Sequence, residues 1–212
     1  MIEIQHPGWD SARYSMAVLP EDCAGQVEET IKLMREYVRA DVKSPQIQRD
    51  LAELKPLVAT GVSPEQAVWQ FVHGRVRFHQ DESRGSEVAL DPRFSLVEVL
   101  TRPADLSVMR DSTGDCDDFA MYTACLLMGL GRRVSFVTVA GDPREPERDS
   151  HVYVASYDMA GNRVPVDASH GPHAGWEVPN PYRITEWPVE NSWPYILALA
   201  FAGYQLLKKV RW

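Results

Sequence analysis

The fold is decided by residues 111–141, DSTGDCDDFAMYTACLLMGLGRRVSFVTVAG. A loop over 101–115, acidic at its end, delivers Cys116, and an apolar stretch over 116–129, predicted to be a helix, follows it directly. Glycines stop that helix, and 132–141 alternates like a β-strand that is covered on both faces. The stretch therefore predicts a cysteine at the start of a buried helix that packs on a sheet.

The flanking sequence extends this prediction to the order helices first, then strands. Apolar residues at spacings of three and four predict a helix over 23–42, and Ser-Pro starts mark helices over 44–61 and 63–78. A shorter helix is expected over 91–100. Downstream, 151–158 and 163–169 flank the turn MAGN and predict a hairpin, and the Pro- and Trp-rich segment 171–192 predicts an extended surface wrap. We therefore expect an α+β fold in which a helical layer packs on an antiparallel sheet.

We expect one compact domain with three regions. These are an N-terminal helical region over 1–62, a core over 63–171 that contains Cys116, and a C-terminal extended wrap with an apolar helix over 172–212. The apolar segment 193–207 is shorter than the roughly 20 residues that span a bilayer. We expect it to pack on the domain or on a second copy of the chain, giving a homo-oligomer and no membrane association.

Composition limits the partners and the compartment. The net charge of -8 argues against binding nucleic acid, which needs a basic stripe. The start, MIEIQHPGWD, lacks the basic and apolar regions of a signal peptide. Three cysteines in irregular spacing give no disulfide framework. We therefore expect a cytoplasmic protein that does not bind nucleic acid.

Cys116 has the setting of a nucleophile. The unpaired N–H groups and the positive dipole end of a helix start stabilise a thiolate, but the neighbouring acids oppose this effect, so a histidine must supply the partner charge. His151 begins a strand that can face the helix start, and Asp167 on the paired hairpin strand can hold its imidazole in one tautomer. We expect His170 and His173 to lie outside this set.

The same residues carry a family resemblance. Gly114-Asp115-Cys116-Asp117-Asp118 resembles the nucleophile motif of the transglutaminase-like superfamily, HVYV at 151–154 resembles its histidine strand, and NRVPVDASHG at 162–171 its aspartate strand. The chain looks most like small bacterial or phage-encoded members. The resemblance implies a papain-like core and acyl transfer on peptide or isopeptide amides through a thioester, with Cys116, His151 and Asp167 as the catalytic triad and no metal or cofactor. Hydrolysis and transamidation stay open.

Other interpretations stay open beside this one. The chain is alternatively a non-catalytic phage structural or morphogenesis protein on the same fold. The acids Asp115, Asp117 and Asp118 either complement the helix dipole or bind calcium through hard oxygens.

Two further assignments are unresolved at this stage. Asp167, His170 and His173 form D-x-x-H-x-x-H, a metal-ligand pattern on a segment with too much Gly and Pro to be a helix. An oxyanion donor from an upstream side chain is expected, and the sequence does not choose among Trp69, Gln70 and Gln80.

Overall fold

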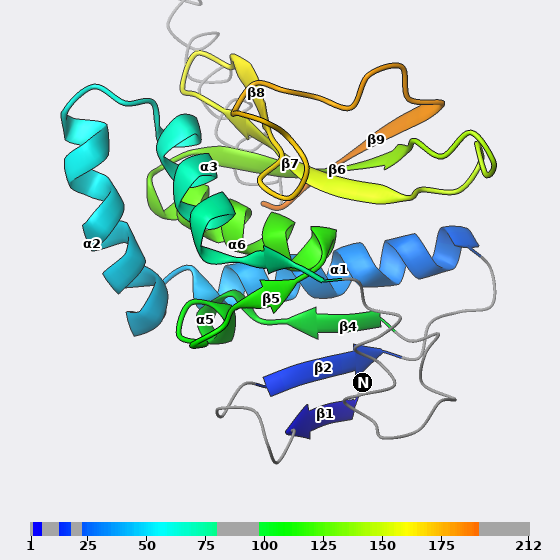
Figure 1. Ribbon diagram of the computed structural model, residues 1–212, viewed down its shortest axis with the longest axis horizontal. Helices are drawn as coiled ribbons and strands as arrows, with labels where there is room; N and C mark the ends of the chain where they lie inside the picture. The colour runs from blue at the N-terminus through cyan, green and yellow to red at the C-terminus, as the bar shows by residue number, and fades with distance from the viewer. Residues whose placement is uncertain (1, 6–12, 18–22, 80–97, 191–212) are drawn as a thin grey trace, which may run out of the picture.

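The computed structural model describes residues 2–5, 13–17, 23–79 and 98–190 and has an α+β fold (Figure 1). The helices are α1 (Cys23–Asp41), α2 (Pro45–Ala59), α3 (Pro64–Arg75), α5 (Pro103–Leu106) and α6 (Cys116–Gly129). The strands are β1 (Ile2–Gln5), β2 (Arg13–Ala17), β3 (Arg77–Phe78), β4 (Glu98–Thr101), β5 (Thr113–Gly114), β6 (Arg133–Ala140), β7 (His151–Tyr157), β8 (Arg163–Val166) and β9 (Arg183–Pro188).

Helix α6 is the centre of the fold. A four-stranded antiparallel sheet, in the order β8-β7-β6-β9, lies against it, while α1 and α3 contact it from other sides (Figure 1). Every residue from Asp117 to Leu127 is buried, so this helix is enclosed all round, as its apolar sequence predicts. The predicted helix over 116–129 is confirmed.

Strand β6 is covered on both faces, as its sequence predicts. Val134 and Phe136 join the main core with α6, whereas Val137 and Val139 pack with Tyr153 in a smaller core on the opposite face. The antiparallel partners of β6 are β7 and β9. The helical layer on an antiparallel sheet is therefore the arrangement of these elements.

Two predicted elements are wrong. A helix is predicted over 91–100, but its last three residues belong to strand β4, which pairs antiparallel with β2. Residues 91–97 lie outside the described part. The surface wrap predicted over 171–192 includes β9, which joins the sheet beside β6. In both places a partner distant in sequence supplies the backbone hydrogen bonds, and local propensity does not report such a partner.

The predicted boundaries need two additions. The helical region over 1–62 holds α1 and α2 as expected, but its first residues contribute β1 and β2 to a three-stranded sheet with β4. The loop expected over 101–115 contains α5 and the short strand β5. The predicted C-terminal helix over 193–207 lies outside the described residues, and among those that are described no helix is long and apolar enough to cross a membrane.

Candidate active site

Cys116 is the first residue of α6, and backbone pairing fixes the loop that presents it. Strand β5 pairs in parallel with β3, and the His79 N–H donates to the Gly114 carbonyl at 2.8 Å. Asp115 then takes an extended conformation as the N-cap, and its carbonyl accepts from the Phe119 N–H at 3.1 Å. The Cys116 side chain is half-buried at a helix start, where backbone N–H groups and the helix dipole favour a thiolate.

Two of the three acids next to Cys116 are structural. Asp118 is fully buried, and its Oδ1 accepts from the Thr101 backbone N–H at 2.6 Å, so it ties the end of β4 to the first turn of α6. A Cβ at Gly114 would lie 2.6 Å from the Asp118 Cβ and Oδ2, so glycine is needed there. Asp117 is also buried, and its Oδ1 accepts from the Asp118 N–H at 2.7 Å.

These positions bear on the two interpretations of the acids. Asp115, Asp117 and Asp118 place ligand oxygens within 4.8 Å of one another, and the group has no fourth member within the described ranges. Calcium needs six to eight oxygens, and Asp118 already uses one of its own on Thr101. The geometry favours the interpretation in which the acids fix the helix start and complement its dipole.

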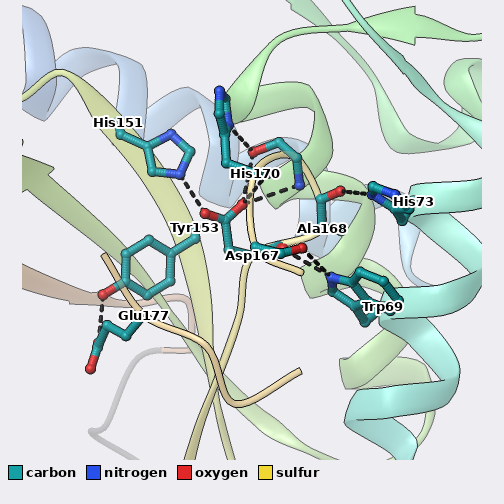
Figure 2. A network of polar contacts seen from close by, with 10 residues as sticks. Trp69, His73, His151, Tyr153, Asp167, Ala168, His170 and Glu177 are labelled. Atoms are coloured by element: carbon teal, nitrogen blue, oxygen red, sulfur yellow. Dashed lines mark hydrogen bonds and ion pairs between the residues drawn. The ribbon is translucent and has the colours of Figure 1, made fainter. Parts of the chain in front are cut away.

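His151 and Asp167 form a hydrogen-bonded pair. The His151 Nε2 lies 2.8 Å from the Asp167 Oδ2, as expected from the sequence (Figure 2). A carboxylate can only accept, so Nε2 carries the proton and the Nδ1 of the neutral ring is a proton acceptor. The pair thus prepares His151 to take a proton at the nitrogen that faces away from Asp167.

In the register of β7 and β8, Asp167 does not lie directly across from His151. Asp167 follows the last residue of β8, and continuing the ladder by one residue sets it across from Tyr153, two residues along β7 from His151. The approximate pairing expected from the sequence is therefore a diagonal contact made just beyond the end of a strand.

Asp167 is held as an anion. Its Oδ1 accepts from the Ser169 N–H at 3.1 Å, the Ser169 hydroxyl at 2.8 Å and the His170 N–H at 2.9 Å. Burial raises the pKa of this carboxyl, but the hydrogen bond and the charge of His151, with those turn donors, bring its pKa down to about 2. A permanent negative charge therefore stands beside the imidazole.

His170 lies closer to this pair than the sequence predicts. Besides donating its N–H to Asp167, it sets its ring edge-on against the His151 ring, with centroids 4.8 Å apart. Burial lowers the pKa of His170, the charge of His151 lowers it further, and Asp167 opposes this. His173 is exposed, and its Nδ1 bonds the Ala174 carbonyl. The spacing Asp-x-x-His, typical of a side chain that caps its own turn, was the available signal for His170.

The metal pattern D-x-x-H-x-x-H is not assembled. The structure groups His151, Asp167 and His170 instead, with ligand atoms within 4.8 Å. In that group the Asp167 carboxylate already accepts four hydrogen bonds, which a metal would have to displace. The arrangement suits an orienting carboxylate better than a metal ligand.

Cys116 and His151 line one cavity of about 470 Å³. One wall is a face of α1, and the opposite wall is the loop between β6 and β7. The α1 wall comprises Gln26, Val27, Thr30, Ile31 and Met34, and the rest of the lining is Asp115, Asp117, Thr138, Asp142, Glu145, Arg148, Asp149, Ser150 and Val152. Five carboxylates and one arginine line the cavity. Three of these carboxylates form ion pairs with arginines: Asp142 with Arg144, Glu145 with Arg148 and Asp149 with Arg183. The excess of negative charge on the wall is therefore carried by Asp115 and Asp117, next to Cys116.

The lining revises the search for an oxyanion donor. Trp69 donates its indole N–H to two backbone carbonyls, and Gln70 is exposed; neither lines the cavity. Gln80 lies outside the described residues. The upstream side-chain donors on the wall are Gln26 and Thr30 of α1, about ninety residues before Cys116, and no local motif in the sequence marks them. Thr138, Arg148 and Ser150 on the same wall follow Cys116 in the sequence.

Comparison with protein-family models and with curated proteins identifies no relative of this chain. No protein-family model matches the chain, and no curated protein matches it either.

Proposed function

We propose that this protein is a cysteine-dependent acyl-transfer enzyme of the transglutaminase-like type, with a papain-like core. The observation that carries the proposal is the His151–Asp167 pair at 2.8 Å, on the wall of a cavity that also contains a cysteine at a helix start. A nucleophile, a base and a group that orients the base are the parts that covalent catalysis on an amide requires.

In the first half of the reaction, His151 takes the proton of the Cys116 thiol, which gives a thiolate and an imidazolium beside the Asp167 carboxylate. The sulfur attacks the carbonyl carbon of a peptide or isopeptide amide, and the carbonyl oxygen takes the negative charge. As the C–N bond breaks, His151 returns its proton to the leaving amine, and a thioester remains on Cys116.

In the second half, His151 takes a proton from water or from an acceptor amine, which then attacks the thioester. The released sulfur leaves as a thiolate, and the imidazolium is ready for the next cycle. Water gives hydrolysis and an amine gives transamidation. Because the chemistry needs a reduced thiol, we place the protein in a reducing compartment such as the cytoplasm.

Selective thiol labelling tests the nucleophile. In the native protein we expect iodoacetamide to modify Cys116 at least about tenfold faster than Cys125, which is fully buried and whose pKa is raised by burial. Cys125→Ala is the matched control and should leave Cys116 labelling unchanged. If Cys116 reacts no faster than Cys23 or Cys125, the nucleophile is misassigned.

A peptide-library screen for cleavage and for amine incorporation tests the reaction. Cys116→Ala should abolish both, and His151→Ala should lower turnover by about 10² to 10⁴, the usual contribution of a general base. Asp167→Asn should cost less than His151→Ala, because orientation contributes less than proton transfer. Activity that survives in Cys116→Ala would refute the assignment of Cys116 as the nucleophile, and a lack of activity in wild type would favour the structural-protein alternative.

A further inference from the structure

Two side chains of helix α3 form hydrogen bonds with the turn that carries Asp167. The Trp69 indole N–H donates to the Asp167 carbonyl and to the Gly171 carbonyl, at 3.0 Å each (Figure 2). The His73 Nδ1 lies 3.0 Å from the Ala168 carbonyl and must be the donor, because a carbonyl only accepts. Three carbonyls within the turn 167–171 are thus held by two side chains of one helix.

The rings of these two side chains also stack on each other. Trp69 and His73 stand four residues apart, on one face of α3, and their rings stack with centroids 4.8 Å apart and planes 13° from parallel. Stacking fixes both rings, so the donors of the two side chains keep a constant spacing. That spacing matches the carbonyls of Asp167, Ala168 and Gly171.

The turn needs this support because the sheet does not provide it. Strand β8 ends at Val166, so Asp167 stands outside the ladder that fixes His151 on β7. The turn closes on itself through the Gly171 N–H, which donates to the Asp167 carbonyl at 3.1 Å. A Cβ at Gly171 would meet that same carbonyl oxygen at 2.7 Å, so the closure is tight.

We propose that Trp69 and His73 are positioning residues that hold the Asp167 carboxylate against His151. Asp167 gives one oxygen to the N–H groups of its own turn and the other to His151, so a shift of the turn moves the second contact directly. Hydrogen bonds weaken steeply with distance and angle, and small misplacements of catalytic groups cost large factors in rate. The catalytic consequence rests on the proposed function; the structural one does not.

The decisive variant is Trp69→Phe, which keeps an aromatic ring to stack on His73 and removes only the N–H donor. Its matched control is Trp176→Phe: Trp176 lies beside Gly171, but its indole N–H makes no hydrogen bond to the three carbonyls. His73→Phe removes the other donor in the same way. Circular dichroism establishes that each variant is folded before it is compared.

The readout is the tautomer of the His151 ring, measured from its two ¹⁵N chemical shifts at a pH where the imidazole is neutral. Wild type and Trp176→Phe should hold the proton on Nε2. Trp69→Phe should raise the population with the proton on Nδ1 by about fivefold to tenfold, since a contact to a charged partner is weakened. A variant that is less stable but keeps the Asp167 carboxylate in place should show the wild-type ratio of the two His151 tautomers.

A folded Trp69→Phe protein with the wild-type tautomer ratio would overturn the proposal, as would an equal change in Trp176→Phe. Cys116 alkylation is measured on the same samples, and it should slow in Trp69→Phe but not in the control. If Cys116 is inert even in wild type, the proposed function fails, while the tautomer ratio still decides whether α3 positions Asp167.

Discussion

Replacing Asp167 by Asn should remove a defined part of the dependence of stability on pH. The Asp167 carboxyl is buried, and its pKa falls from the ordinary value of 3.8 to about 2 in the folded protein. A tenfold change in proton affinity is worth about 1.4 kcal/mol, so the anion contributes about 2.5 kcal/mol to the free energy of unfolding.

The sign follows from the lowered pKa. The folded protein binds this proton less readily than the unfolded chain, so the contribution is fully present above the unfolded pKa of about 4. It is lost as the pH falls through the folded value of about 2. In wild type, the free energy of unfolding should therefore fall by about 2 kcal/mol more between pH 5 and pH 2 than it does in Asp167→Asn, because at pH 2 about half of the folded molecules still carry the anion.

Urea unfolding at several pH values between 5 and 2 measures this difference, because other carboxyl groups titrate alike in both proteins and cancel. Asp158→Asn is the control at the other end of the hairpin. Hydrogen bonds from Asn162 lower the pKa of Asp158 too, but this group is exposed, so its replacement should change the pH dependence little. A gap between wild type and Asp167→Asn that stays constant over this range would refute the reasoning.

Two further predictions concern the helix start and the cavity. Gly114→Ala should lower the free energy of unfolding by more than about 2 kcal/mol, since the added Cβ would lie 2.6 Å from Asp118, whereas Gly74→Ala, with open space around it, should be neutral or stabilising in thermal unfolding. Iodoacetamide should alkylate Cys116 faster than the anionic iodoacetate does, after each rate is divided by that for the unfolded protein, because Asp115 and Asp117 on the cavity wall lie next to Cys116 in the chain. Salt and Glu145→Gln should narrow that ratio, and a ratio near one at low salt would contradict the acidic cavity.

The parts of the fold that the sequence predicts are those whose signals are local. Helix α6 follows from an apolar run between an acidic start and terminal glycines, and β6 follows from its alternation. Strand β9 carries mostly exposed side chains and includes a proline, so its membership of the sheet depends on β6 rather than on its own pattern. Strand β4 likewise depends on β2.

The features of the candidate site also fall into those with a local sequence signal and those without one. Cys116, His151 and Asp167 each stand in a short motif, and the His151–Asp167 contact follows from hairpin pairing. The α1 wall of the cavity and the hold of α3 on the turn 167–171 join segments about ninety to a hundred residues apart. Such contacts arise from tertiary packing, and no spacing in the sequence records them.

One wall of the cavity is more exposed to solvent than the others. Helices α1 and α6 are bound into the core, whereas the loop from Gly141 to Ser150 is largely exposed, and its ends are fixed by the pairing of Val139 with His151. Exchange of that loop would alter what enters the cavity while Cys116, His151 and Asp167 keep their supports. If the proposed function holds, substrate choice and folding should be separable, and a graft between Gly141 and Ser150 is the natural place to redirect the proposed acyl transfer to a new donor.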